Sequence, residues 1–200
     1  MNGYTKKRIL IVVEGQVTEP IYFAGLKQRP EIREGYTITV KSGKGGSATQ
    51  CVKKAQSEKE RADNGDPFDE IWCVLDVEGK TERPQLDEAL KAADDAGLKK
   101  PVLSCPCFEV WLLAHFEKTA RRVADAKEMI AVLSKRWQSE FKTPYSKNDP
   151  RLYDRLGDLT ETAIKNARKV YEQHFPPGTD RADRNSSTEV YKLVDRLLHG

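Results

Sequence analysis

The stretch Arg8-Ile9-Leu10-Ile11-Val12-Val13-Glu14-Gly15 decides how the first half of this chain folds. It contains an uninterrupted run of aliphatic, mostly β-branched residues. Such a run is typical of a strand that is covered on both faces, as strands in parallel sheets are. A carboxylate and a glycine follow at once, so the pattern predicts a buried strand over residues 8–13 that ends at Glu14.

Further strand and helix patterns alternate after this run. Strands are predicted over residues 36–40, 71–75 and 101–104. Helices are predicted from about residue 21 to 29, from 47 to 62 and from 85 to 96, the last closed by Gly97. An order of strands alternating with helices predicts an α/β fold whose mostly parallel, Rossmann-like sheet is flanked by helices.

The second half of the chain has helical patterns only. They cover residues 108–116, 124–141, 152–159, 161–174 and 188–198. The predicted organisation is therefore an α/β core over residues 1–116 and a helical extension over residues 117–200 that packs on this core.

Composition limits the class of protein. The chain has 200 residues, of which 32% are charged and 38% hydrophobic, as expected of a soluble globular protein. The formal net charge is only +3, so any nucleic-acid-binding surface must come from clustering of basic residues. No apolar run approaches the ~20 residues that span a bilayer. The apolar run after the first lysines is also too short for a signal peptide, so we expect a cytoplasmic protein without membrane contact.

The chain has four cysteines, Cys51, Cys73, Cys105 and Cys107. The last two form a C-x-C pair, which allows a metal or redox site or simply small buried residues in a reducing compartment. We favour buried residues, because zinc sites usually have C-x2-C pairs with further ligands nearby.

Acidic residues follow two of the predicted strands. In open α/β sheets, ligands bind beyond the carboxyl ends of the strands. Glu14 follows the first strand, and Asp76 and Glu78 follow the third with i, i+2 spacing, which puts both side chains on one side of an extended chain. Carboxylates this close repel each other unless a cation lies between them. We therefore expect the three residues to hold Mg²⁺ or Mn²⁺.

Glu109 lies in the apolar segment Pro106-Cys107-Phe108-Glu109-Val110-Trp111. It could face solvent in the first turn of a helix, where a carboxylate suits the helix dipole. It could instead be a fourth acidic member of the metal site, as a ligand or a base. We favour the second interpretation, which would give the carboxylate a partner in a setting where an unpaired charge is costly. The nearby His115 is interpreted as a packed core residue.

The segment Lys41-Ser42-Gly43-Lys44-Gly45-Gly46 is rich in glycine and lysine. It lacks the spacing of a Walker A motif. Two lysines and glycine amides before a helix could still bind phosphate, which makes Lys41 and Lys44 candidate contacts to nucleic acid. The alternative is an ordinary connection between a strand and a helix.

Val12-Val13-Glu14-Gly15 together with Asp76-x-Glu78 resembles the Toprim signature, a glutamate after one strand and an acidic D-x-D pair after a later one. Toprim domains occur in primases, topoisomerases, recombination proteins and nucleases of the OLD type. This chain has Glu78 where the signature has a second aspartate, and its longer side chain changes the expected metal geometry.

A closer resemblance, to the RloB family, extends over almost the whole chain. It is carried by Glu14-Gly15-x-x-Thr18-Glu19-x-x-Tyr22-Phe23, Asp76-Val77-Glu78, the block from Pro106 to Phe116, Ala163-Ile164-Lys165-Asn166-Ala167 and Asn185-Ser186-Ser187-Thr188-Glu189-Val190-Tyr191. The resemblance implies a Toprim-like fold and a partner ATPase of the ABC/AAA class encoded nearby in antiphage defence loci. Asn185 and Thr188 would belong to a family motif, although this segment could simply cap the last helix.

Two functions fit these observations. The first is a metal-dependent nuclease that cleaves DNA or RNA, with Glu14, Asp76, Glu78 and Glu109 in its active site. The second is a non-catalytic effector or sensor that binds nucleic acid or nucleotide and docks on the ATPase. The acidic residues favour the nuclease, because a binding module needs basic groups facing phosphate and gains nothing from converging carboxylates.

Overall fold

The first strand, β1 (Lys7–Val13), divides its side chains between two hydrophobic cores. In the computed structural model, which describes residues 5–43, 46–79 and 82–200, Ile9, Ile11 and Val13 contact one core. Leu10 and Val12 contact the other. All five are buried, so the strand is covered on both faces as its composition predicts.

The other elements follow in the predicted alternation. In the first half they are α1 (Thr18–Leu26), α2 (Pro30–Gly35), β2 (Tyr36–Ser42), α3 (Ala48–Asp63), β3 (Glu70–Asp76), α4 (Arg83–Asp95) and β4 (Val102–Cys105). In the second half they are α5 (Glu109–Ala114), α6 (Ala126–Phe141), α7 (Leu152–Leu156), the 3-10 turn η1 (Gly157–Leu159), α8 (Thr160–Gln173), the 3-10 turn η2 (Arg181–Asp183), β5 (Ser187–Thr188) and α9 (Val190–His199).

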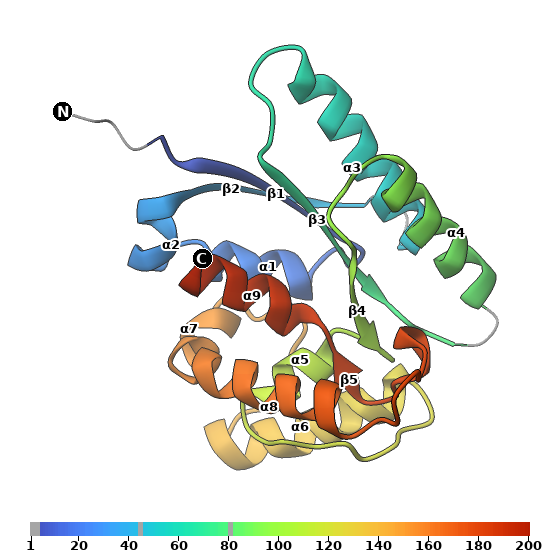
Figure 1. Ribbon diagram of the computed structural model, residues 1–200. Helices are drawn as coiled ribbons and strands as arrows, with labels where there is room; N and C mark the ends of the chain where they lie inside the picture. Colours follow the sequence, from blue (N-terminus) through green and yellow to red (C-terminus); the bar gives the residue numbers. More distant parts are fainter. Residues whose placement is uncertain (1–4, 44–45, 80–81) are drawn as a thin grey trace.

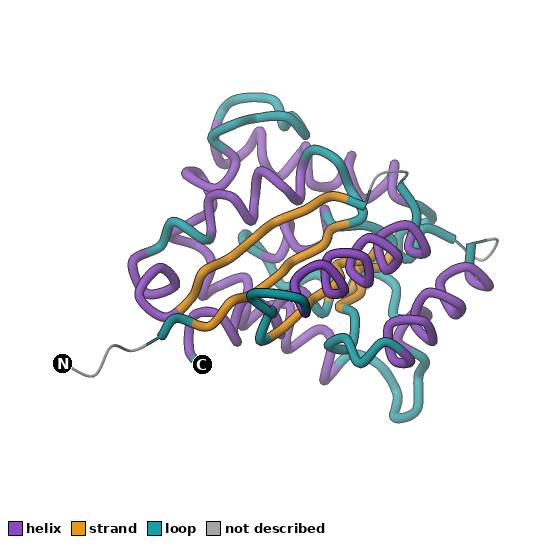
Figure 2. Tube along the Cα trace, turned by 90° about the horizontal axis from the view of Figure 1, so that it is seen from above, coloured by secondary structure: helices purple, strands orange, loops and turns teal. Residues whose placement is uncertain are grey.

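The strands form one sheet in the order β2-β1-β3-β4-β5. The first four are parallel, and only the short β5 is antiparallel, to β4. Helices α3 and α4 cover one face, and α1, α9 and the remaining helices of the second half lie on the other (Figure 1). The view from above shows the strands running between these helical layers (Figure 2). The predicted α/β class with a helical C-terminal half is confirmed.

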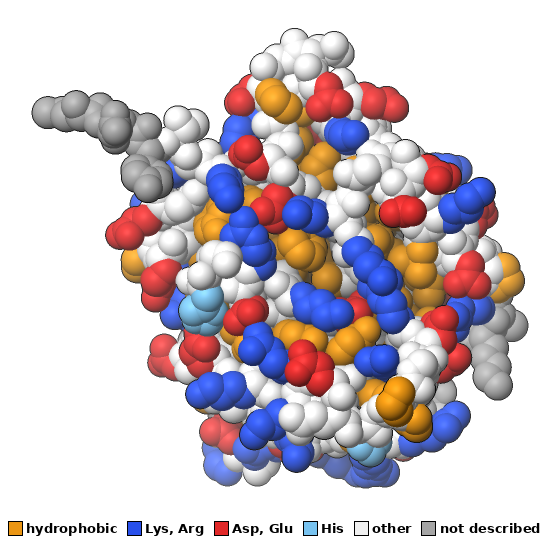
Figure 3. All heavy atoms as spheres, in the orientation of Figure 1, with side chains coloured by type: hydrophobic (Ala, Val, Ile, Leu, Met, Phe, Trp, Pro, Cys, Tyr) orange, Lys and Arg blue, Asp and Glu red, His pale blue; other side chains and the backbone are white. Residues whose placement is uncertain are grey.

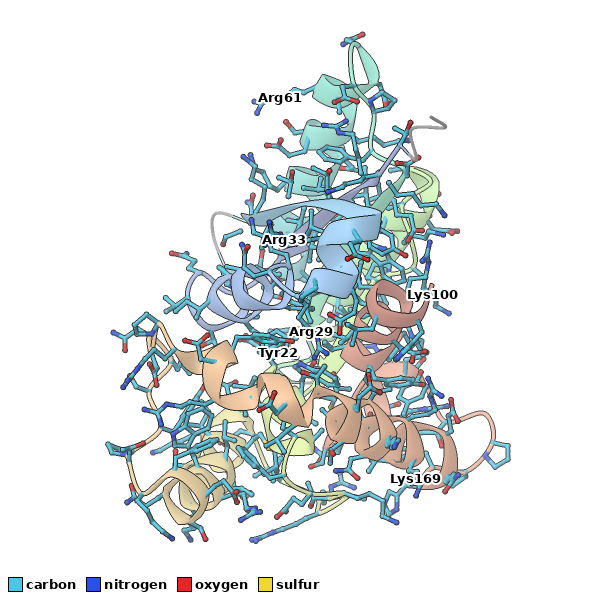
Figure 4. All side chains as sticks on the ribbon, turned by 90° about the vertical axis from the view of Figure 1, so that its left-hand side faces the viewer. Tyr22, Arg29, Arg33, Arg61, Lys100 and Lys169 are labelled. Carbon is cyan, nitrogen blue, oxygen red and sulfur yellow. The ribbon has the colours of Figure 1, made fainter. Side chains whose placement is uncertain are left out.

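The helical half shares a core with the sheet. Residues from β1, α1 and α5 to α9 form one continuous cluster, in which Trp111 and Leu112 are fully buried. In Figure 4, Tyr22 and Arg29 lie where the first helices meet the helical half. The Arg29 guanidinium donates to the Gly157 carbonyl at 3.2 Å. A domain boundary at residue 116 stays a prediction, since both halves contribute to this core.

Two elements differ from the sequence prediction. The pattern indicated a helix end near Pro30, but this proline is the first residue of the short helix α2. Proline suits that position because its fixed φ is helical and its missing N–H would have no partner there. Strand β5 was also missed, because it is only two residues long.

The Asn185 to Thr188 segment does more than cap a helix. The Asn185 side chain donates to the Val123 carbonyl and accepts from the Val123 N–H, both at 2.9 Å. Thr188 pairs with Ser104 in the sheet, and their hydroxyls lie 2.8 Å apart. The Thr188 hydroxyl also accepts the Val190 N–H at the start of α9. The segment thus ties the loop before α6 and the edge of the sheet to the last helix.

The four cysteines are free and buried, as predicted. His115 is buried too, and its Nε2 lies 3.3 Å from the Tyr22 hydroxyl. Across the described part of the chain, the helices are all too short or too polar to span a membrane.

Gly25 permits the close approach of α1 to α7. A Cβ at this position would lie 2.3 Å from the Cβ of Tyr153, an atom that no rotamer change can move. We expect Gly25→Ala to lower the free energy of unfolding by about 2 kcal/mol, as overpacking of a core contact does. Urea unfolding followed by circular dichroism measures this change.

The matched control is Gly35→Ala at the end of α2, where nothing among the described residues lies within 4 Å of the added Cβ. Alanine there should leave stability unchanged or raise it slightly. Equal effects of the two substitutions would contradict close packing between α1 and α7.

Candidate functional site

Glu14 and Asp76 meet at the carboxyl ends of two neighbouring strands. The Glu14 N–H continues the β1–β3 pairing by donating to the Val74 carbonyl at 3.1 Å. The Glu14 carboxylate then accepts the Asp76 N–H, also at 3.1 Å. Parallel strands in register therefore bring these two carboxylates to one edge of the sheet, as the sequence analysis expected.

These residues line a cavity of about 270 Å³. The acidic residues around it are Glu14, Glu19, Asp76, Glu78 and Glu109, and the basic one is Lys147. Glu14 is 7% exposed and Glu109 only 2% exposed, whereas Glu78 lies at the solvent side. All four acidic residues proposed from the sequence thus reach one cavity.

Glu109 is turned into this cavity and away from solvent. It is the first residue of α5, and its carboxylate accepts from the Tyr145 hydroxyl at 3.3 Å. The ammonium of Lys147 lies 3.0 Å from the same oxygen. The interpretation of Glu109 as a solvent-facing first-turn residue is therefore wrong, and the buried charge is paired as burial requires.

Glu19 and Lys147 belong to the site although sequence reasoning did not select them. The Gly15 N–H donates to the Glu19 carboxylate at 3.0 Å, so the first turn of α1 folds back on the strand end. A Cβ on Gly15 would lie 2.1 Å from a Glu19 oxygen, so any larger residue here would displace the Glu19 carboxylate from this position. The Thr18 hydroxyl holds the Lys147 carbonyl at 3.3 Å. The spacing Glu14-Gly15-x-x-Thr18-Glu19 was the available signal for Glu19.

Crowding and burial keep protons on these carboxylates. Burial raises the pKa of Glu14 from 4.5 to about 7, with smaller contributions from the charges of Glu78 and Glu19 and an opposing one from the Asp76 N–H. Burial, and then the charges of Glu19 and Glu14, raise the pKa of Asp76 well above its ordinary value. Burial also raises the pKa of Glu19. Ionising these carboxyl groups together is therefore costly unless a cation compensates their charge.

Lys147 supplies part of the positive charge that compensates these carboxylates. Burial lowers its pKa, but Glu109 and other neighbouring acidic groups outweigh this effect, so the pKa is raised on balance. Its side chain remains 54% exposed, which leaves the ammonium accessible to a ligand. Lys147 can therefore contact a phosphate at the mouth of the cavity while it stays paired with Glu109.

The donor set fits a hard divalent cation by chemistry. Carboxylate oxygens are the ligands that Mg²⁺ and Mn²⁺ prefer, and this cavity offers several of them. Within residues 5–43, 46–79 and 82–200, however, no three acidic, histidine or cysteine side chains already converge closely enough to hold a metal ion. Metal binding would therefore require the carboxylates to change rotamer.

The glycine-rich segment reaches the cavity at one end only. Gly46, with φ of 64°, lines the cavity. Lys41 is exposed and aligns with Val12, which packs toward α3, so Lys41 does not line the cavity. Lys44 lies outside the described residues. The phosphate-binding roles of both lysines stay predictions.

Charge on the rest of the surface is mixed. In Figure 3, Lys and Arg side chains are interspersed with Asp and Glu side chains over the face that α8 and α9 present. This distribution agrees with the small net charge. On this face, basic and acidic side chains alternate instead of forming one broad basic patch (Figure 3).

The raised pKa of Glu14 predicts a specific pH dependence of stability. Its folded-state pKa of about 7 exceeds the unfolded value of 4.5, so the folded state binds more protons between these pH values. Stability of the metal-free protein should therefore fall as pH rises through this window, by roughly 3 kcal/mol from Glu14 alone. Glu14→Gln removes this titration and should make the profile less steep, leaving the slope that the raised pKa values of Asp76 and Glu19 contribute.

The measurement is urea unfolding with a chelator at half-unit steps from pH 5 to pH 8. Glu88→Gln, at an exposed position on α4, is the control and should reproduce the parent profile. A Glu14→Gln profile as steep as that of the parent would show that Glu14 does not titrate in this window.

Comparison with known proteins gives one match. Neither the curated proteins nor the solved structures contain a match to this chain. The model of the family described as RloB-like protein matches residues 9–197, which include all but the first residues of β1, the acidic cavity and all but the last residues of α9. The chain therefore belongs to the RloB-like protein family.

Proposed function

We propose that this protein is a divalent-metal-dependent nuclease that hydrolyses phosphodiesters of DNA or RNA. The observation that carries the proposal is the convergence of Glu14, Asp76, Glu78 and Glu109 on one cavity at the carboxyl ends of parallel strands. Buried like charges are costly, and a fold that gathers them at the usual ligand-binding edge of the sheet gains only if a cation binds there.

Glu14, Asp76 and Glu78 would hold Mg²⁺ or Mn²⁺. When bound, such an ion activates water and neutralises charge on a scissile phosphate. Alternatively, Glu14 would act as a general base or acid instead of a ligand, because without a metal ion burial raises its pKa to about 7, where a carboxyl can exchange a proton with water near neutral pH. Glu109, held by Tyr145 and Lys147, would serve as a further ligand or orient the attacking water.

Lys147 would bind the phosphate that enters the cavity. Among the described residues that line the cavity it is the basic one, and its side chain is about half exposed. Lys41 and Lys44 would contact phosphates further along the strand. Family membership supports a Toprim-like nuclease that acts in antiphage defence with an ATPase of the ABC/AAA class, as the resemblance implies.

One observation favours a second candidate function. Among the described residues, the acidic side chains do not yet form a set that would hold a metal ion as they stand. A non-catalytic effector or sensor that binds nucleic acid or nucleotide and docks on the ATPase would need no such set. A cleavage assay separates the two functions directly.

Asp76→Asn tests the nuclease proposal. It should abolish cleavage of labelled DNA or RNA in Mg²⁺ or Mn²⁺, with and without the neighbouring ATPase, because it removes a central carboxylate. The fold should persist, and stability at neutral pH should hold or rise, since the substitution relieves repulsion around a carboxyl whose pKa is strongly raised. Thermal melts should show a metal-induced stabilisation in the parent that is reduced in the variant.

The matched control is Glu34→Gln, an exposed carboxylate on α2 two residues before the start of β2, and so near the amino ends of the strands, away from the carboxyl ends where the cavity lies. It should cleave like the parent. Undiminished cleavage by Asp76→Asn would refute the site assignment. If the parent itself cuts neither DNA nor RNA, even with the ATPase, the result refutes the nuclease and favours the non-catalytic effector or sensor.

Lys147→Ala tests the phosphate contact. We expect weaker binding of nucleic acid of any sequence and a salt dependence whose logarithmic slope is smaller by about one, as loss of one phosphate contact predicts. Fluorescence anisotropy across a salt series, with chelator to prevent cleavage, measures both. Lys127→Ala, at an exposed position on α6, should change neither. Unchanged affinity and slope in Lys147→Ala would restrict Lys147 to its ion pair with Glu109.

A further inference from the structure

A second cavity, of about 490 Å³, adjoins the acidic one. The two share Glu78, which lines both. The segment that follows β3 therefore separates them, with Asp76 lining the acidic cavity and Val77 the second one. Its volume is in the range of pockets that bind small organic groups, and a ligand in it would lie next to the proposed scissile phosphate.

The walls of the second cavity combine apolar surface with guanidinium groups. Val77, Pro106 and Ala182 supply apolar surface. The charged residues lining it include Arg83 and Arg122 as well as Glu78 and Asp183, so the cavity has no net preference for an anion. A flat, partly polar group suits such walls better than a phosphate does.

The two arginines differ in their freedom. The Arg83 guanidinium is held by Asp180 at 2.7 Å, Asp87 at 3.1 Å and Asp183 at 3.4 Å. Arg122 is exposed, and among the described residues it has no hydrogen bond or ion pair that would fix its guanidinium. Arg83 is thus part of the wall, whereas Arg122 is available to contact a ligand in the cavity.

We propose that the second cavity binds an unpaired nucleobase of the same strand whose phosphate lies at the acidic cavity. The Arg122 guanidinium stacks on the base, and the apolar wall excludes water from its other face. Stacking on guanidinium planes and apolar side chains is how proteins commonly hold unstacked bases. The proposal deepens the proposed nuclease function and rests on it.

The inference specifies a substrate class. A base inside a duplex is paired and stacked, so it cannot enter a separate cavity unless it is extruded at an energetic cost. The preferred substrate is therefore single-stranded nucleic acid or an unpaired loop. Discrimination arises from the base beside the cleavage position, not from contacts to the phosphates.

The test compares binding to two probes in the presence of a chelator. One is a fluorescent single-stranded oligonucleotide, and the other is a strand of equal length and charge that carries only abasic sites. The parent should bind the base-containing strand more tightly. Arg122→Ala should weaken binding to that strand about fivefold and leave binding to the abasic strand nearly unchanged, because only the stacking contact is lost.

Two further variants sharpen the comparison. Arg122→Lys keeps the charge but lacks the planar guanidinium, so it should lose base-dependent affinity much as alanine does. Arg121→Ala is the matched control, since Arg121 is a neighbour that is also exposed, pairs with Glu128 at 3.6 Å and does not line this cavity. It should bind both strands like the parent. Circular dichroism melts check that all variants remain folded.

Equal losses on both strands in Arg122→Ala would show a phosphate contact and overturn the proposal, as would no loss on either. A mononucleotide that binds as tightly as the oligonucleotide would also overturn it, because the cavity would then serve a free nucleotide. The outcome is independent of cleavage. If the parent cuts nucleic acid but Arg122 variants show no base-dependent loss, only this inference fails, whereas base-dependent binding without any cleavage would refute the nuclease alone.

Discussion

Repulsion among carboxylates buried around one cavity is the constraint that the rest of the structure accommodates. The buried or half-buried members are Glu14, Glu19, Asp76 and Glu109. Burial of such groups is tolerated only where donors or protons compensate the charge. The donors come from main-chain N–H groups at the strand ends, which bond Glu14 and Glu19, and from the side chains of Tyr145 and Lys147, which bond Glu109.

The origin of these donors explains why the two halves of the chain depend on each other. The sheet supplies the N–H groups, but Tyr145 and Lys147 belong to the connection between α6 and α7. Thr18 on α1 fixes that connection through the Lys147 carbonyl. The helical half therefore supplies positive charge and hydrogen-bond donors to a site whose carboxylates lie on or beside the α/β half. The shared core holds the two halves together.

The part of the site that follows from strand geometry could be predicted from the sequence. An aliphatic run that ends in an acidic residue identifies Glu14, and the same logic identifies Asp76, because parallel strands end at one edge. Glu109 could be selected because an acidic residue in an apolar segment needs a partner. In each case the local pattern selects the residue, and the fold then brings the selected residues close together.

The other members could not be found this way because they depend on tertiary contacts. Lys147 is one lysine in a polar loop, and it is brought to the cavity by tertiary contacts, the bond from Thr18 to its carbonyl and its ion pair with Glu109. Strand β5 is too short to give an alternating pattern, and it exists because Thr188 pairs with Ser104. Arg121 and Arg122 are neighbours of the same type, and no local pattern encodes that Arg122 is the one that lines the second cavity.

The segment Asp76-Val77-Glu78 explains why two cavities of different character adjoin each other at the end of β3. In an extended chain, successive side chains point to opposite sides, so Asp76 lines the acidic cavity and Val77 the apolar wall of the other. Val77 is held there by its N–H, which donates to the Ser104 carbonyl at 2.8 Å and prolongs the pairing of β3 with β4. One strand end thus gives a charged surface on one side and an apolar surface on the other. A nucleotide has the same division, between a phosphate that binds cations and a base that favours a flat apolar contact, which is the division that the proposed base site uses.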